Sequence, residues 1–401
     1  MPRVAQTKSR RLILAMVIGF AIAFAGCTGR AERRNTLTIA LAVFPMEAAQ
    51  YQVFVRDFAA SHRVRVVLVA QTYTDILRAL RAEGGAGRGR LDLVELDLST
   101  LGEARDLVRP LDRIAGLQAR TLFPPSAWQA ASFGGHVYFV PHRLMWQAMI
   151  YNRIEVPRPP ATWAELRDFV RRHPGKFALK GARYEGLICD AMPFVWDAGG
   201  AELAPIAPGS LAALDFLHEL APGLNPNSAV FREMSVLEAQ ARGEVWIHFN
   251  WPFAIGYLQS KGLAPQVDLS APLPAGPGGG NSTPLGGGYL AIPRSAPHPE
   301  LAAAFLQYLL APEVQQKLSR AMNWYGSNGP PPGSDFERLY AGFTAMRPFV
   351  HARPPVPYYV ELSDDWQRAL REILFDDRDP VAAATRVAAR IPAAMNSSQS
   401  R

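Results

Sequence analysis

Residues 36–43, TLTIALAV, 64–70, VRVVLVA, and 91–96, LDLVEL, decide the fold of this chain. All three segments are rich in branched apolar residues, which is typical of β-strands buried in a sheet. In the two intervening segments, 46–60 and 73–81, apolar residues recur at helical spacing. Strands that alternate with helices in this way predict α/β units with a parallel sheet at their centre.

The rest of the chain continues this alternation and becomes mainly helical in its last third. Residues 272–288 are rich in Pro and Gly but lack the Lys-Ser/Thr ending of a phosphate-binding loop, so a hairpin or hinge loop is expected there. Thr162 and Glu165 have the spacing of a capping box at a helix start. Further strands are expected at 137–141, 146–151 and 245–250, and further helices at 163–172, 211–220, 235–243, 252–261, 299–310, 312–322, 336–343, 362–374 and 380–390.

The N-terminus has the pattern of a secretory signal. Four basic residues precede an apolar run, 12–25, that is shorter than the roughly 20 residues of a membrane span. Ala25 and Gly26 are small, as expected at a cleavage site, and Cys27 follows them directly. This order resembles a bacterial lipobox, which implies that Cys27 is lipidated and becomes the first mature residue. The alternative is an ordinary signal peptide with a chance cysteine.

Charge and cysteine content narrow the function classes. The formal charge of +7 falls to +3 without the four basic residues of the signal, and no basic stripe follows, so nucleic-acid binding is not expected. No later stretch is long and apolar enough to span a membrane. If Cys27 carries lipid, Cys189 has no partner for a disulfide, and a buried thiol is favoured over a nucleophile.

Seven motifs, in one order along nearly the whole mature chain, resemble the extracellular solute-binding proteins of ABC importers, the group that contains maltose- and trehalose-binding proteins. Each motif alone is weak, but their shared order is specific for the fold. The motifs lie at Asp92–Asp97, Trp146–Glu155 with Pro160–Leu166, Phe194–Gly200, Gly243–Pro252, Gly286–Ile292, Pro299–Leu306 with Pro312–Gln315, and Ala352–Tyr359.

The resemblance implies a two-lobe periplasmic-binding-protein fold of type II, in which each lobe has a mostly parallel sheet flanked by helices. The lobes are joined by crossing segments and close on a ligand by hinge motion. Crossings are expected near residues 139–144, 285–289 and 329–333. The implied organisation is signal 1–27, tether 28–35, lobe 1 at 36–141 plus 289–332, lobe 2 at 142–288 plus 333–395, and tail 396–401.

A sugar offers hydroxyls to fixed polar groups and C–H faces to aromatic rings, so a sugar site combines carboxylates or amides with aromatic residues. In α/β sheets ligands bind beyond the carboxyl ends of strands, which is where Asp97 lies. We expect Asp97 and Glu47 to accept hydrogen bonds from the sugar hydroxyls, and Trp251 to stack on the sugar. The remaining candidates are walls and polar contacts: Tyr73, Trp196, Asn250, Gly288, Tyr289 and Arg353.

Several of these residues have structural alternatives. Trp163 is expected to pack in the core, and His248 to be a satisfied buried histidine. Glu95 can be merely solvated, and Arg353 can form a structural salt bridge. Pro193 stands where many sugar-binding relatives have an acidic residue, which weakens the prediction of a specific disaccharide.

The predicted function is capture of an oligo- or disaccharide, as a monomer without cofactor or metal, for delivery to an ABC permease. Another solute, such as a glycerol phosphodiester, a polyamine or an iron complex, is the first alternative. A glycoside hydrolase would need two carboxylates facing each other across a cleft. Asp92, Glu95 and Asp97 share one strand, and no Gly-x-Ser-x-Gly or His-Glu-x-x-His motif occurs, so an enzyme is not expected. A structural lipoprotein or signalling co-receptor without an importer is the third class.

Overall fold

The structure is a computed structural model that describes residues 36–43, 45–84, 89–114, 122–263, 266–270, 276–277, 280–322, 341–343 and 345–399. The chain divides into two units, residues 1–35 and 36–401, and the described residues all belong to the second. The signal, Cys27, the tether and the third expected crossing, 329–333, lie outside the described residues, as does most of the helix expected at 336–343.

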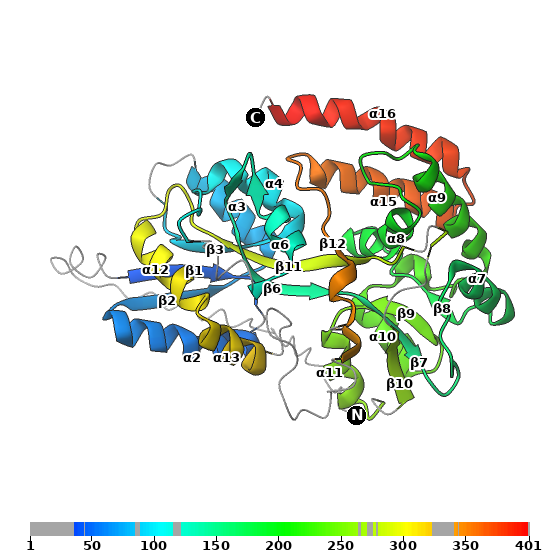
Figure 1. Cartoon of the computed structure of the whole chain (residues 1–401), viewed down its shortest axis with the longest axis horizontal. Helices are drawn as coiled ribbons and strands as arrows, with labels where there is room; N and C mark the ends of the chain where they lie inside the picture. Colours follow the sequence, from blue (N-terminus) through cyan, green and yellow to red (C-terminus); the bar gives the residue numbers. More distant parts are fainter. Residues whose placement is uncertain are drawn as a thin grey trace, which may run out of the picture. The chain divides into compact units, whose positions relative to one another are not determined.

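The first sheet contains the three strands expected near the N-terminal end of the described chain, β1, β2 and β3. β1 pairs in parallel with both β2 and β3, as their alternation with helices predicts. β11 runs antiparallel to β3 and to β6. The strand order is β12–β11–β3–β1–β2, with β6 also paired to β11 (Figure 1). The strands are β1 (Thr36–Leu41), β2 (Arg65–Ala70), β3 (Leu93–Asp97), β6 (Val140–Trp146), β11 (Thr283–Ala291) and β12 (Val350–His351).

Helices cover this sheet and complete the first hydrophobic core. α2 packs on β2 and α13, and α3 packs on β3. Ile39, Phe58, Leu96 and Phe305 belong to this core. Its helices are α2 (Pro45–His62), α3 (Tyr73–Gly84), α4 (Leu101–Ala104), α6 (Pro125–Ala130), α12 (Pro299–Leu309) and α13 (Pro312–Met322), and a short hairpin joins β4 (Ser132–Phe133) to β5 (His136–Val137).

The second sheet differs from the expectation. Its order is β10–β7–β9–β8, and only β8 and β9 pair in parallel, so the prediction of a mostly parallel sheet is wrong here. β7 follows β6 after one residue, so its direction is set by the chain arriving from the first sheet and not by a βαβ unit. The strands are β7 (Ala148–Asn152), β8 (Phe177–Ala178), β9 (Ile247–Asn250) and β10 (Val267–Ser270).

The second core lies among these strands and the C-terminal helices. Thr162 caps α7 by accepting the Glu165 N–H at 3.2 Å, as predicted. Trp163 stacks on Phe216 with ring centres 4.4 Å apart, which confirms its core role. α15 packs against α8, α9 and α16. The helices are α7 (Trp163–Arg172), α8 (Glu185–Asp197), α9 (Pro208–Leu220), α10 (Glu233–Ala241), α11 (Phe253–Ser260), α15 (Tyr359–Phe375) and α16 (Pro380–Gln399).

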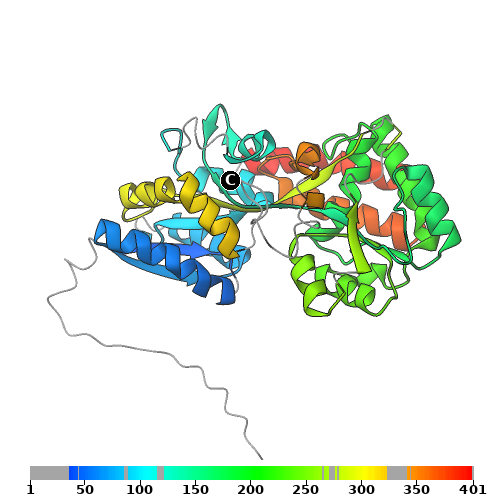
Figure 2. The same ribbon diagram turned by 60° about the horizontal axis from the view of Figure 1, so that its bottom comes forward.

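Two paired strands, β6 and β11, connect the cores (Figures 1 and 2). Leu144 on β6 packs in the first core, whereas Trp146 on the same strand packs in the second. β6 and β11 contain the segments expected to cross near 139–144 and 285–289. The loop expected at 272–288 was wrong for its last residues, because β11 begins at Thr283.

Candidate functional site

A cavity of about 1240 Å³ is lined by elements of both cores and by the two connecting strands. From the first core it receives the start of α3 and the residues that follow β3. From the second it receives the start of α8, the first residue of α10 and Trp251, which follows the strand Ile247–Asn250. Its principal polar and aromatic lining residues are Tyr73, Asp97, Arg143, Tyr184, Glu185, Glu233, Trp251 and Arg353.

Arg143 on β6 is the centre of a buried charged group. Its guanidinium donates to the Tyr73 hydroxyl at 2.9 Å and lies 3.5 Å from a Glu47 carboxylate oxygen and 3.8 Å from one of Glu95. The ring of His142 lies 3.1 Å from Glu95. Burial alone would raise the pKa of Glu95, but Arg143 and His142 outweigh it and lower this pKa to about 2.

This group corrects two expectations. Glu95 is fully buried, so it is not a solvated residue. Glu47 does not line the cavity, and its carboxylate faces Arg143. Tyr73 does line the cavity, at the start of α3 where the sequence places it.

Asp97 ends β3 and lines the cavity. One carboxylate oxygen, Oδ1, accepts the Ser99 N–H at 2.8 Å and the Ser99 hydroxyl at 2.5 Å, which caps the turn at Leu98–Thr100. Gly288 pairs with Asp97 on the neighbouring strand. A Cβ on Gly288 would stand 2.0 Å from the Glu95 carboxylate, so this position requires glycine for packing and does not itself line the cavity.

Trp251 follows β9 and lies half-buried in the cavity wall. Its ring edge lies over Gly286, where a Cβ would come within 2.8 Å of the indole. Asn250 is fully buried beside it, and both ends of its amide are used inside the protein. Its oxygen accepts the Trp251 N–H at 2.9 Å, and its nitrogen donates to the Glu233 carbonyl at 3.0 Å. Asn250 therefore holds the wall in place and is not exposed to a ligand.

Two aromatic residues expected in the cavity pack elsewhere. Trp196 is buried in the second core, where its indole N–H donates to Glu202 at 3.0 Å and its ring stacks on His351. Tyr289 is fully buried in the first core and donates to the Ala127 carbonyl at 3.3 Å. Their positions as cavity walls were wrong, because each ring finds apolar packing and a polar partner inside its own core.

Arg353 lines the cavity but is nearly fully buried. It forms an ion pair with Glu185 and donates to the Leu285 carbonyl on β11 at 3.2 Å. Glu185 also accepts the Tyr359 hydroxyl at 2.7 Å and the Ser363 hydroxyl. The structural salt bridge is thus present, and it ties α8 to a connecting strand.

Sequence reasoning missed Tyr184, Glu185 and Glu233. The Tyr-Glu-Gly step at 184–186 directly before and within the first turn of α8 was the available signal. By contrast His248 is confirmed as a satisfied buried histidine, because its Nε2 lies 3.0 Å from the Gln240 amide oxygen. Cys189 is confirmed as a buried thiol, and burial raises its pKa to about 12.

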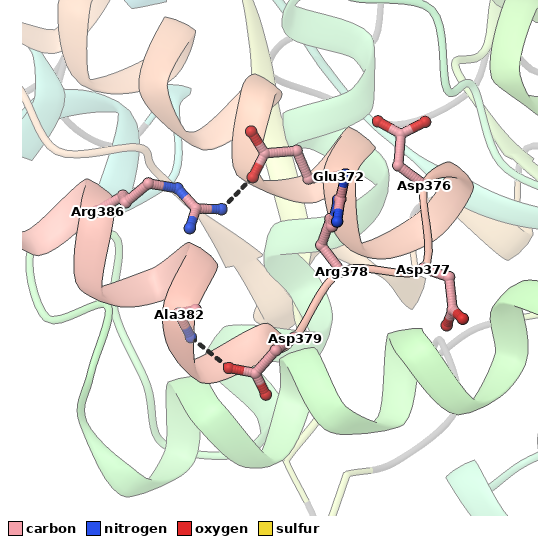
Figure 3. A pocket seen from close by; sticks show the side chains of 7 residues that line it. All are labelled: Glu372, Asp376, Asp377, Arg378, Asp379, Ala382 and Arg386. Atoms are coloured by element: carbon pink, nitrogen blue, oxygen red, sulfur yellow. Dashed lines mark hydrogen bonds and ion pairs between the residues drawn. The ribbon is translucent and has the colours of Figure 1, made fainter.

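A second, smaller hollow of about 630 Å³ lies at the turn between α15 and α16 (Figure 3). Its side chains serve the turn itself: Asp379 accepts the Ala382 N–H at 2.7 Å, and Arg386 pairs with Glu372. All of its lining residues come from this one turn and the helices beside it, so the cavity around Trp251 is the better candidate site.

The described part of the chain contains no group of three or more metal-ligating side chains. None of its helices is long and apolar enough to cross a membrane.

Comparison with known proteins agrees with this architecture. The chain is 25% identical over 284 residues to a probable ABC transporter-binding protein of Deinococcus radiodurans, covering 63% of this chain and 66% of the relative. It is 26% identical over 245 residues to the maltotriose-binding protein of Pyrococcus abyssi, covering 58% and 51%. The matches thus span about two thirds and about half of these relatives' lengths.

The fold is shared with solved structures. The maltose-bound MalE3 protein of T. maritima superposes with a TM-score of 0.73 at 22% identity, covering 89% of this chain and 99% of that one. The fold is therefore that of a type II periplasmic binding protein. The family described as bacterial extracellular solute-binding protein matches residues 54–331, more than half of the chain. The chain belongs to the family of bacterial extracellular solute-binding proteins.

Proposed function

We propose that this protein is the substrate-binding component of an ABC sugar importer and captures an oligo- or disaccharide in the cavity around Trp251. The observation that carries the proposal is the composition of that cavity. It combines an aromatic platform, Trp251, with carboxylates and with residues of both cores, so that a bound solute would be held from two sides. The relatives named for maltotriose and maltose support the sugar class.

In the proposed site Trp251 stacks on a C–H face of the sugar, and Asp97 accepts a hydroxyl through the oxygen that does not cap its turn. Tyr73 and Glu233 offer further polar atoms from opposite walls. Arg353 pairs with Glu185, and Arg143 pairs with Glu95. In the proposal both arginines mainly stabilise the cavity walls and make few contacts with the solute. A hydrogen bond to a charged acceptor contributes roughly 1.5–3 kcal/mol.

The proposal includes the cellular setting. Cys27 carries the lipid anchor, residues 28–35 form the tether, and the monomer works outside the cytoplasm beside its permease. Lobe 1 comprises 36–141 plus 289–332, and lobe 2 comprises 142–288 plus 333–395. We propose binding without chemical conversion of the solute, because the chain belongs to a family of solute-binding proteins.

A thermal-shift screen over mono- and oligosaccharides, glycerol phosphodiesters and polyamines tests the proposal. A ligand at a hundred times its dissociation constant adds roughly 2.7 kcal/mol to the stability of the protein. We expect a saccharide to give the largest shift and to be recovered unchanged after incubation. A shift given only by a phosphodiester or polyamine would refute the sugar assignment, and cleavage of the saccharide would refute the absence of catalysis.

A further inference from the structure

In the described part of the structure, the cationic side chains that line the cavity all have ion-pair partners, whereas some of the lining carboxylates do not. Four guanidinium groups line it, and each has a carboxylate partner of its own. Among the described residues, the lining carboxylates Asp97 and Glu233 have no ion pair with a cation. The four pairs are Arg78 with Asp75, Arg81 with Glu103, Arg143 with Glu47 and Arg353 with Glu185.

Asp97 is at least compensated by hydrogen bonds, because the Ser99 N–H and hydroxyl both donate to it. The Glu233 carboxylate has a neutral group, the Tyr184 hydroxyl, near it, and after burial, the larger cause, it raises the pKa of that hydroxyl. Glu233 lines the second-core wall as the first residue of α10, and the positive charge next to it in the sequence, Arg232, lies over the Tyr184 ring at 4.3 Å. Glu233 is therefore a lining carboxylate without an ion pair among the described residues, although a cation, Arg232, lies on the same wall over Tyr184.

Glu233 is also fixed relative to the aromatic platform. The Asn250 amide donates to the Glu233 carbonyl and accepts the Trp251 N–H, so one buried side chain positions both residues. Tyr184 lines the same wall. Its pKa is raised by burial and then by the Glu233 carboxylate near it. The Tyr184 ring already has the Arg232 guanidinium over it, so Trp251 is the aromatic residue of this wall that remains for a bound cation.

An acidic residue in the first turn of a helix has an ordinary role, because it interacts favourably with the helix dipole by about 0.3–1 kcal/mol. Glu233 fulfils that role in α10. The role explains the residue type but does not depend on the side chain lining a cavity, and it predicts no effect on a ligand. The two roles can therefore be separated by measuring stability and binding on the same variant.

We propose that the cavity selects a saccharide that carries a protonated amino group, with the Glu233 carboxylate as its counterion and Trp251 as its aromatic neighbour. This inference rests on the proposed function and narrows its ligand class. A carboxylate without an ion pair in the cavity wall favours a cationic ligand electrostatically, and the ammonium group supplies that ion pair.

Paired sugars test the inference by isothermal titration at pH 6 with the full-length protein in detergent. Each pair shares one sugar ring: glucosamine and glucose, galactosamine and galactose, and glucosamine oligomers with their N-acetylated forms. We expect the amine of at least one pair to bind ten-fold or more tightly than its neutral counterpart. Added salt should reduce this preference, because it screens the charge pair.

The substitution Glu233→Gln should remove the preference, whereas Glu238→Gln, an exposed acid on the same helix, should retain it. Equal melting temperatures of the two variants would exclude misfolding as the cause. If neutral sugars bind and no amine is preferred, the inference is overturned and the proposed function stands. A preference that survives in Glu233→Gln overturns the assignment to Glu233. If no saccharide of either kind binds, both the inference and the proposed function fall.

Discussion

Gly287 and Arg143 lie on neighbouring connecting strands, and the Arg143 carbonyl oxygen comes within 1.8 Å of the place where a Cβ on Gly287 would stand. Gly287 has a φ of 128°, a backbone conformation that residues with a Cβ rarely adopt. Both features require glycine at this point, where β11 passes β6 between the cores. The side chain of Arg143 meanwhile reaches Tyr73 in the cavity wall, so the close strand contact also positions the site.

Gly287→Ala is therefore expected to destabilise the protein by about 1–3 kcal/mol or more, because it adds backbone strain and a steric overlap. Urea unfolding followed by tryptophan fluorescence measures the change. Gly256→Ala is the matched control, since Gly256 lies inside α11 with open space around its Cβ position. Alanine there should stabilise the helix by about 0.5–1 kcal/mol. Equal effects of the two substitutions would contradict this account of Gly287.

Trp251→Ala is expected to weaken sugar binding by roughly 2 kcal/mol, about thirty-fold in Kd, if the indole is the central platform of the site. Titration calorimetry with the saccharide found by screening measures the loss. Phe253→Ala serves as the control, because Phe253 is 45% exposed two residues away and does not line the cavity. An unchanged affinity of the Trp251 variant would remove the indole from the proposed site.

Cavity-lining residues at the ends of strands were predicted correctly from the sequence. Candidate site residues whose side-chain direction depends on contacts with distant parts of the chain were not. Asp97 ends a strand and Trp251 follows one, and both line the cavity as strand position implies. Trp196 and Tyr289 were misplaced because the direction of a ring depends on contacts distant in sequence, such as that of Tyr289 with Ala127. The role of Asn250 could not be predicted either, because it depends on the contact of its amide with the Glu233 carbonyl.

The architecture shows the same division. The βαβ alternation around β1 to β3 is a local pattern and predicted their parallel pairing. The antiparallel pairing of β7 with β9 and β10 depends on where the chain enters the second sheet after β6. The spacing of apolar residues within one segment carries no information about that.

Cys27→Ser should release the protein from the membrane fraction, because a serine hydroxyl cannot form the thioether that holds the lipid. Fractionation and mass spectrometry of the N-terminal peptide measure anchoring and modification. Cys189→Ser is the control. Cys189 is buried inside the folded protein, far along the chain from the signal, so its substitution should leave anchoring intact. A wild-type protein found entirely in the soluble fraction would instead favour an ordinary signal peptide.

Asp197 at the end of α8 predicts a pH dependence of stability. It is 4% exposed, and burial raises its pKa to about 7, although a hydrogen bond with Ser282 partly opposes the shift. The folded pKa thus exceeds the unfolded value of about 3.9, so folding favours the protonated form. The contribution of this group is complete below about pH 4 and is lost as the pH rises through 7, by at most about 1.4 kcal/mol per pH unit.

Asp197→Asn should therefore gain stability relative to the wild type as the pH rises from 5 to 8, because the amide never ionises. Urea unfolding at several pH values gives the difference in free energy directly. Asp376→Asn, an exposed aspartate after α15, provides the control and should follow the wild type throughout. Glu95 acts in the opposite sense, since its pKa is lowered to about 2 and its contribution is lost only when the pH falls towards that value. The two groups are thus separated by pH range, and a difference between Asp197→Asn and the wild type that stays constant from pH 5 to 8 would show that Asp197 does not titrate there.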